Sequence, residues 1–175
     1  MKLANWMLAA VLLLVAPHVL AFKDPTMPVS RFEEDFDEKP WSEVEVQLPA
    51  FPEKENLIAF KVGAVVESLF FIDGKSIVIG SDGVIRYVLV VVSSQGAQNI
   101  SYEGMRCDTL ERRFYASGRS DKTWSKARNN QWVRIQGTSN NHHVELFNNN
   151  FCPNKIISPS AEEARRVLRQ GGISR

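Results

Sequence analysis

Only a few residues of this sequence have the types and spacing that catalysis or metal binding requires. His142 and His143 are adjacent, with Glu145 two residues further on. They lack the i, i+4 spacing of two zinc ligands on a helix and lie in a stretch rich in asparagine. The tripeptide Gly74–Ser76 is similar to the end of a phosphate-binding loop, but Leu69 stands where that loop has its first glycine. A solvated loop and a hairpin turn are the simpler interpretations.

Acid–base or redox chemistry is equally poorly supported. Tyr102 and Glu103 would need a third catalytic partner, and the sequence identifies none. A redox role for Cys107 and Cys152 would need a labile bridge between them. We therefore assign no catalytic residue, no metal site and no cofactor, and an enzyme is the weaker hypothesis.

A basic segment with aromatic residues is the best candidate for a binding surface. Between residues 106 and 134 there are eight basic and three acidic residues, with Trp124 and Trp132 among them. Such a surface suits phosphate groups, an acidic protein or single-stranded nucleic acid. The alternative is a set of ion-paired strands around core tryptophans. The hypothesis is an anion-binding or partner-binding surface made of Arg112, Arg113, Arg119, Trp124 and Arg128.

The first 21 residues have the features of a secretory signal peptide. Lys2 gives the positive start, residues 8–15 are apolar, and residues 19–21 end in Ala21, before the expected cleavage site. The apolar centre is too short to span a bilayer, so we expect no transmembrane span in the mature chain. An uncleaved N-terminal anchor is the alternative. An exported protein meets little nucleic acid, so we expect no nucleic acid partner.

Export also bears on the two cysteines. In an oxidising compartment a pair of cysteines persists as a disulfide, so Cys107 and Cys152 are expected to be linked. A reactive or metal-binding thiol pair is the alternative. The sequence has no Cys-x-x-Cys motif and no histidine at ligand spacing from either cysteine to support it.

Residues 22–48 are expected to form an acidic, partly mobile N-terminal arm. Between residues 22 and 55 there are ten acidic and four basic residues, and five prolines interrupt long helices or strands. Phe32 and Phe36 have the spacing of a short docked helix; a wholly disordered arm is the alternative. Residues 49–172 then form a single domain tied by the disulfide.

Alternating apolar residues predict an α+β fold, mainly an antiparallel β meander of about six to eight strands with short helices. Strands are expected at 44–48, 57–62, 84–92, 98–107, 110–117 and 131–135. A hairpin turning at Asp73-Gly74 is expected to join strands 69–72 and 76–79. Residues 84–92 are apolar on both faces, so both faces should be covered. The capping box Ser160–Glu163 begins a C-terminal helix over 161–169, whereas residues 143–151 suit either a short strand or a helical turn.

Several blocks of the sequence resemble one known family. Tyr-Glu-Gly-Met-Arg-Cys at 102–107, Phe-Cys-Pro at 151–153 and Ser-Asp-Gly-Val-Ile-Arg-Tyr at 81–87 are similar to the CNP-one-like (CNP1-like) family, small exported proteins of proteobacteria. The likeness covers about residues 49–171. It implies a location in the cell envelope, in the periplasm of a Gram-negative bacterium. It implies no activity and no catalytic residue.

These observations predict a non-enzymatic periplasmic protein that acts by binding through a basic and aromatic sheet surface. Its partner would be an unknown envelope protein or an anionic component of the envelope. Two alternatives remain open: a redox or hydrolytic enzyme of the envelope, and a structural accessory subunit of an envelope complex.

Overall fold

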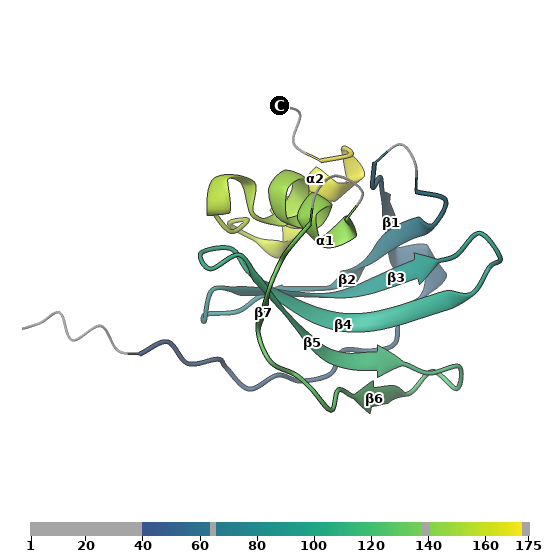
Figure 1. Ribbon diagram of the computed structural model, residues 1–175, viewed down its shortest axis with the longest axis horizontal. Coiled ribbons are helices and arrows are strands. Elements are labelled where there is room, and N and C mark those ends of the chain that lie inside the picture. Colours follow the sequence, from purple (N-terminus) through teal and green to yellow (C-terminus); the bar gives the residue numbers. More distant parts are fainter. Residues whose placement is uncertain (1–39, 64–65, 138–140, 173–175) are drawn as a thin grey trace, which may run out of the picture. The chain divides into compact units, whose positions relative to one another are not determined.

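A seven-stranded antiparallel sheet organises the chain from Trp41 onward (Figure 1). The computed structural model describes residues 40–63, 66–137 and 141–172. The predicted signal peptide and residues 22–39 of the predicted arm lie outside this part. The strands are β1 (Leu57–Phe60), β2 (Leu69–Ile79), β3 (Val84–Val92), β4 (Gln98–Arg106), β5 (Glu111–Gly118), β6 (Trp124–Lys126) and β7 (Val133–Arg134). They follow one another in the sheet from β1 to β6, and β7 pairs with β5, which confirms the predicted meander.

The short helices that follow the last strand cover one face of the sheet, whereas the first short helix leads directly into β1. The helices are η1 (Lys54–Asn56), α1 (His142–Glu145), the π-helix η2 (Leu146–Phe151), η3 (Pro153–Lys155) and α2 (Ala161–Arg169). The helix α2 packs against β1 and β2. It begins where the sequence predicts, because the Ser160 side chain accepts a hydrogen bond of 3.1 Å from the backbone N–H of Glu163. The α+β fold class is confirmed.

The strand β3 is buried on both faces, as its composition predicts. Ile85, Tyr87 and Leu89 belong to a core beneath the helices. Val88 and Val90 belong to a second cluster on the other face, with Tyr102 and Ala116. This second face is covered in part by the extended segment 41–52, which contributes Val46.

The predicted hairpin at Asp73-Gly74 is wrong. Residues 69–79 form the single strand β2, which pairs with β3 along its length and carries a bulge between Asp73 and Val78. A primed hairpin turn needs a positive φ at its glycine, and Gly74 is not among the residues with positive φ. Ser76 stabilises the bulge: its hydroxyl donates to the carbonyl of Asp73 at 2.7 Å and accepts from the N–H of Val88 at 2.8 Å.

Two further strand predictions need correction. Residues 44–48 are extended but belong to no strand. They pack on a face of the sheet, where Val46 contacts the second cluster, and do not pair with an edge strand. The strand predicted at 131–135 is only Val133–Arg134. Residues 143–151, for which strand and helix were both open, are helical.

The strands β4 and β5 form a hairpin that turns at residues 107–110. Arg106 pairs with Glu111, and Glu103 pairs with Phe114 beside a bulge. The guanidinium of Arg106 lies 3.5 Å from the Glu111 carboxylate. Its positive charge also lies 3.9 Å from the centre of the Trp41 ring, a cation–π contact that joins this hairpin to the start of the described chain.

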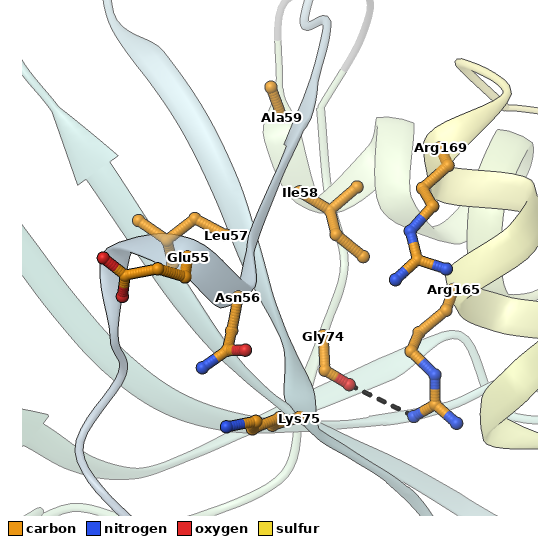
Figure 2. Close-up of a pocket in the computed structure, with 9 residues that line it drawn as sticks. All are labelled: Glu55, Asn56, Leu57, Ile58, Ala59, Gly74, Lys75, Arg165 and Arg169. Atoms are coloured by element: carbon orange, nitrogen blue, oxygen red, sulfur yellow. Dashed lines mark hydrogen bonds between the residues drawn. The ribbon is translucent and has the colours of Figure 1, made fainter.

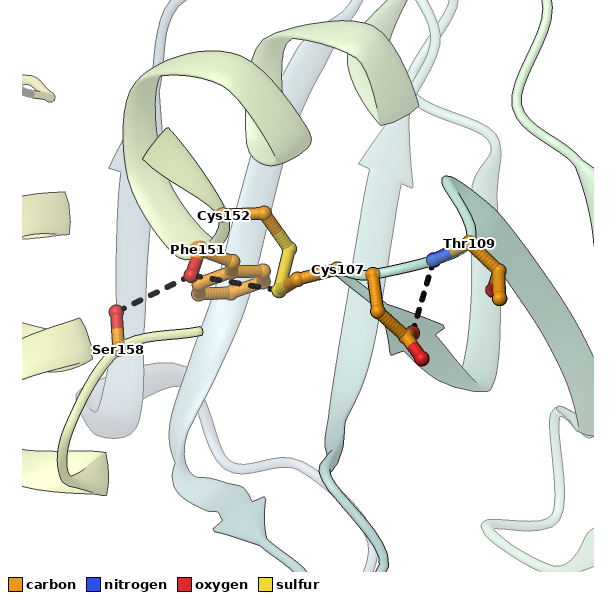
Figure 3. Close-up of a disulfide and its surroundings, with 6 residues drawn as sticks. Cys107, Thr109, Phe151, Cys152 and Ser158 are labelled. Atoms are coloured by element: carbon orange, nitrogen blue, oxygen red, sulfur yellow. Dashed lines mark hydrogen bonds between the residues drawn. A yellow bond between two sulfur atoms is a disulfide. The ribbon is translucent and has the colours of Figure 1, made fainter. Parts of the chain in front are cut away.

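A disulfide joins the β4–β5 turn to the helical layer (Figure 3). The sulfur atoms of Cys107 and Cys152 are 2.06 Å apart, and both residues are buried. Cys152 directly follows η2, so the bridge links the sheet to the layer of helices that covers it. The predicted pairing is confirmed.

The double substitution Cys107→Ser, Cys152→Ser should lower the free energy of unfolding by up to about 4 kcal/mol. The reason is that a bridge across 45 residues restricts the unfolded chain strongly. Denaturant titration of the oxidised protein and the variant measures the difference. A reductant should bring the wild type to the stability of the variant and leave the variant unchanged. Equal midpoints for the variant and the oxidised wild type would contradict the role of the bridge.

Candidate functional site

The predicted basic surface is divided by the sheet. Arg112 and Arg113 are neighbours on β5, so their side chains point to opposite faces. Arg112 pairs in register with Met105, which lies in the core beneath the helices. Arg113 points to the other face and forms an ion pair with Glu43. The charge of Arg113 is therefore matched within the protein.

The other three predicted residues lie around β6. Arg119 and Arg128 are exposed, on either side of that strand. Trp124 is half-buried: its indole N–H donates to the carbonyl of Pro49 at 2.9 Å, and its ring packs 5.4 Å from that of Phe51. Trp124 thus helps to hold the segment 41–52 on the sheet. The structure does not bring all five predicted residues onto one surface.

A buried charge network on this face centres on Arg86. Its guanidinium donates to Asp82 at 2.6 Å and to Glu43 at 3.0 Å, and the residue is 4% exposed. Asp82 also accepts a bond of 3.0 Å from the backbone N–H of Val44. Burial opposes the charged form of Arg86, but the hydrogen bonds that it donates to Asp82 and Glu43 outweigh this effect and raise the pKa of Arg86. The guanidinium of Arg86 stays charged, and the network holds the segment 41–52 against β3.

Tyr115 completes the same network. Its hydroxyl donates to Glu43, and its ring lies over Gly104 on the neighbouring strand, where a β-carbon would clash with the hydroxyl. A glycine is needed at 104 for this approach. Burial, followed by the hydrogen bond to Glu43, raises the pKa of Tyr115, so the phenol remains a donor.

A second buried polar cluster lies beneath the helices. The Nε2 atom of His143 is 2.7 Å from a carboxylate oxygen of Glu103, which also accepts from Ser101 at 2.7 Å and from Tyr87 at 3.4 Å. Burial would raise the pKa of Glu103, but the bonds from His143 and Ser101 lower it overall. Tyr102, the other half of the acid–base pair considered from sequence, lies on the opposite face with Tyr115.

His142 is next to this cluster but makes a different contact. Its ring stacks on Phe70, with 5.2 Å between the centroids. Burial, together with the charge of His143, lowers the pKa of His142 to about 4. A carboxylate–imidazole pair is able to move protons in principle, yet Glu103 and His143 line neither of the grooves described next. We interpret the cluster as a set of buried polar contacts that hold α1 on the sheet.

An open groove lies on the sheet face opposite the helices. Its volume is about 540 Å³. Eight of its lining residues are apolar and three are polar, and no carboxylate lines it: Phe51, Pro52, Leu57, Leu69, Phe71, Val90, Val92 and Ile100, with Lys54, Gln98 and Lys122. We call this the sheet-face groove. Leu69 is 59% exposed there, a large apolar side chain left open to solvent.

A second groove, of about 700 Å³, lies between β1 and α2 (Figure 2). We call it the edge groove. It is lined by residues 55–59, by Gly74 and Lys75 of the β2 bulge, and by Arg165 and Arg169 of α2. Figure 2 shows both arginines reaching from α2 toward β1, whereas the Glu55 carboxylate points away from them. Arg165 donates to the carbonyl of Gly74 at 3.1 Å.

The residues that line the two grooves were mostly missed by the sequence analysis. Arg165 and Arg169 stand four residues apart on a predicted helix, so their common face was a signal that was available. Lys75 was considered only as part of the tripeptide Gly74–Ser76, which was assigned to a hairpin that the structure does not contain. Lys122 was counted in the basic segment, but nothing in the sequence distinguishes it from Lys126.

Across 40–63, 66–137 and 141–172, no three His, Cys, Asp or Glu side chains are grouped so that they could hold a metal ion. None of the helices in the same ranges has the length and apolarity needed to cross a membrane.

Comparison with known proteins identifies one family. The model of the CNP1-like family matches residues 36–169. The match begins inside the segment 22–48 that the sequence analysis set apart from the domain, and it includes Glu43. No curated protein and no solved structure matches the chain.

Glu43→Ala should lower the free energy of unfolding by about 1.5–3 kcal/mol, because Arg113 loses its carboxylate partner and Arg86 keeps only Asp82. Denaturant titration measures the loss. Glu45→Ala is the matched control, since Glu45 is exposed two residues away and should cost less than about 0.5 kcal/mol. Similar losses in the two variants would show that the network does not hold the segment.

Stability should fall as the pH falls from about 6.5 to about 4. In this range the unfolded chain protonates His142, while the folded chain, with its lowered pKa, does not, so protons favour unfolding. The lowered pKa of Glu103 extends the loss to more acidic pH.

Melting temperatures measured from pH 7 to pH 4 test this. The variant His142→Phe, which keeps a ring against Phe70, should lose less stability than the wild type over that range. An equal slope in the two proteins would rule out His142 as the titrating group.

Proposed function

This chain belongs to the CNP1-like family, and from this premise we propose that it is a non-enzymatic protein of the bacterial periplasm that binds an anionic, lipid-like component of the envelope through its sheet surface. The family assignment carries no specific role, so the proposal is based on the site. The observation that carries it is the sheet-face groove: eight apolar residues with two lysines and no carboxylate.

The composition of the groove matches an amphiphile with a negative head group. Apolar floors with a few polar groups are typical of sites for small molecules, and a volume of about 540 Å³ is within their usual range. An acyl chain would cover Phe71, Val92 and the exposed Leu69. Lys54 and Lys122 would then pair with the head group.

The aromatic part of the prediction supports the same surface. Trp124 does not line the groove, but it packs against Phe51, which does. The turn between β5 and β6 carries Lys122 and the exposed Arg119. We therefore place the proposed basic and aromatic surface at the ends of strands β1–β4 and no longer at the arginines of β5. The predicted signal peptide supports the proposed location in the periplasm.

Binding to vesicles tests this function. The protein should sediment with vesicles of phosphatidylglycerol at low salt, less at high salt, and weakly with phosphatidylcholine, because the head-group contact is electrostatic. Leu69→Glu and Lys122→Glu should each weaken binding to phosphatidylglycerol by about tenfold, equivalent to about 1.4 kcal/mol.

Each variant has a matched control. Val78→Glu changes an exposed apolar residue, 52% exposed, on the same strand outside the groove. Lys126→Glu reverses an exposed lysine near Lys122. Both controls should bind like the wild type. Vesicle binding that does not change with salt concentration would refute the proposal. So would control variants whose binding is weakened as much as that of the groove variants.

A further inference from the structure

The edge groove follows the outer edge of the sheet. Its lining includes five consecutive residues, 55–59, whose side chains cannot all point to one side. Ile58 is buried on the helix face, whereas Leu57 packs with the cluster on the other face. The groove is therefore lined along this stretch by the backbone of β1 and the residues just before it. Because β1 is the first strand of the sheet and pairs, among the described residues, only with β2, alternate N–H and C=O groups of its other edge have no strand partner there.

Positive charge gathers along this edge. Arg165 and Arg169 reach toward β1 from α2, and Lys75 stands at the foot of the groove (Figure 2). Among the ion pairs of the described residues, neither arginine has a carboxylate partner. Lys75 is 3.5 Å from Glu53, but both side chains are largely exposed, and such surface pairs contribute little.

We propose that the edge groove binds an extended acidic segment of a partner protein, which adds to β1 as a further strand and places its carboxylates against Arg165 and Arg169. Backbone hydrogen bonds to the free edge of β1 would give affinity, as in other cases of strand addition. Carboxylates on one side of the added strand would meet the two guanidinium groups, whose planar donors suit them.

The charges select this occupant over a second copy of the chain. Two β1 edges paired antiparallel would bring two sets of Arg165, Arg169 and Lys75 together, and like charges oppose that contact. An acidic strand has the opposite sign. A strand spanning the five lining residues would be about 17 Å long, so a short segment is sufficient.

A blocked eight-residue peptide of alternating valine and glutamate is the probe. Calorimetry with the purified protein should show binding that weakens with salt, and the valine–lysine counterpart should not bind. A version of the acidic peptide with N-methyl groups on alternate residues keeps the charge but cannot complete the ladder, so it should bind at least tenfold more weakly. Hydrogen exchange at residues 57–60 should slow when the acidic peptide is bound.

Arg169→Gln should weaken peptide binding by about tenfold, because it removes an exposed charged donor that forms no ion pair with any described residue. Arg166→Gln is the matched control on the same helix. Arg166 pairs with Glu163 outside the groove, so this variant should bind within twofold of the wild type.

Three results would overturn the proposal: equal binding of the N-methylated peptide, equal effects of the two arginine variants, or protection of residues 57–60 that arises from self-association in the absence of peptide. The edge groove and the sheet-face groove share only Leu57. Vesicle binding and peptide binding can therefore fail separately.

Discussion

The pairing of Arg86 with the carboxylates of Asp82 and Glu43 is the interaction on which the arrangement of this domain depends. Arg86 is the one charged residue in the strand β3, and it points to the face away from the helices. A buried guanidinium without partners would be very costly. Asp82 lies in the adjacent turn and is local, but Glu43 comes from 43 residues earlier in the chain. The segment before β1 must therefore return across the sheet, and its contacts at Val46 and Phe51 follow from that path.

On each face of the sheet, a carboxylate joins the sheet to the layer that covers it. Glu43 belongs to the covering segment and binds Arg86 and Arg113 of the sheet, whereas Glu103 belongs to the sheet and binds His143 of α1. Apolar packing alone tolerates several positions of a covering layer. A buried polar pair tolerates few, because a displaced partner leaves a charge unsatisfied. The disulfide adds a covalent link on the helix side only.

Local patterns in the sequence were sufficient for most strands and for the C-terminal helix, since side-chain periodicity and capping depend on near neighbours. The errors arose where a distant contact decides the local structure. Asp73-Gly74 has the composition of a turn, but Ser76 bonds to Val88 across the sheet and keeps β2 continuous. Likewise, residues 44–48 alternate like a strand and yet lie on a face of the sheet. Composition also could not show that Arg112 and Arg113, which are adjacent in sequence, point to opposite faces of the sheet.

Both grooves lie at β1 and β2 for a structural reason. The segment 41–52 crosses the second face and ends at η1, so that face remains uncovered near Leu69 and Phe71. On the other side, α2 packs on β1 and β2 but leaves a gap beside the edge of β1, which its arginines enter. The covering layers are thus shorter than the sheet they cover. Leu69 therefore stays exposed beside one gap, and in the other Arg165 and Arg169 form no ion pair with any described residue.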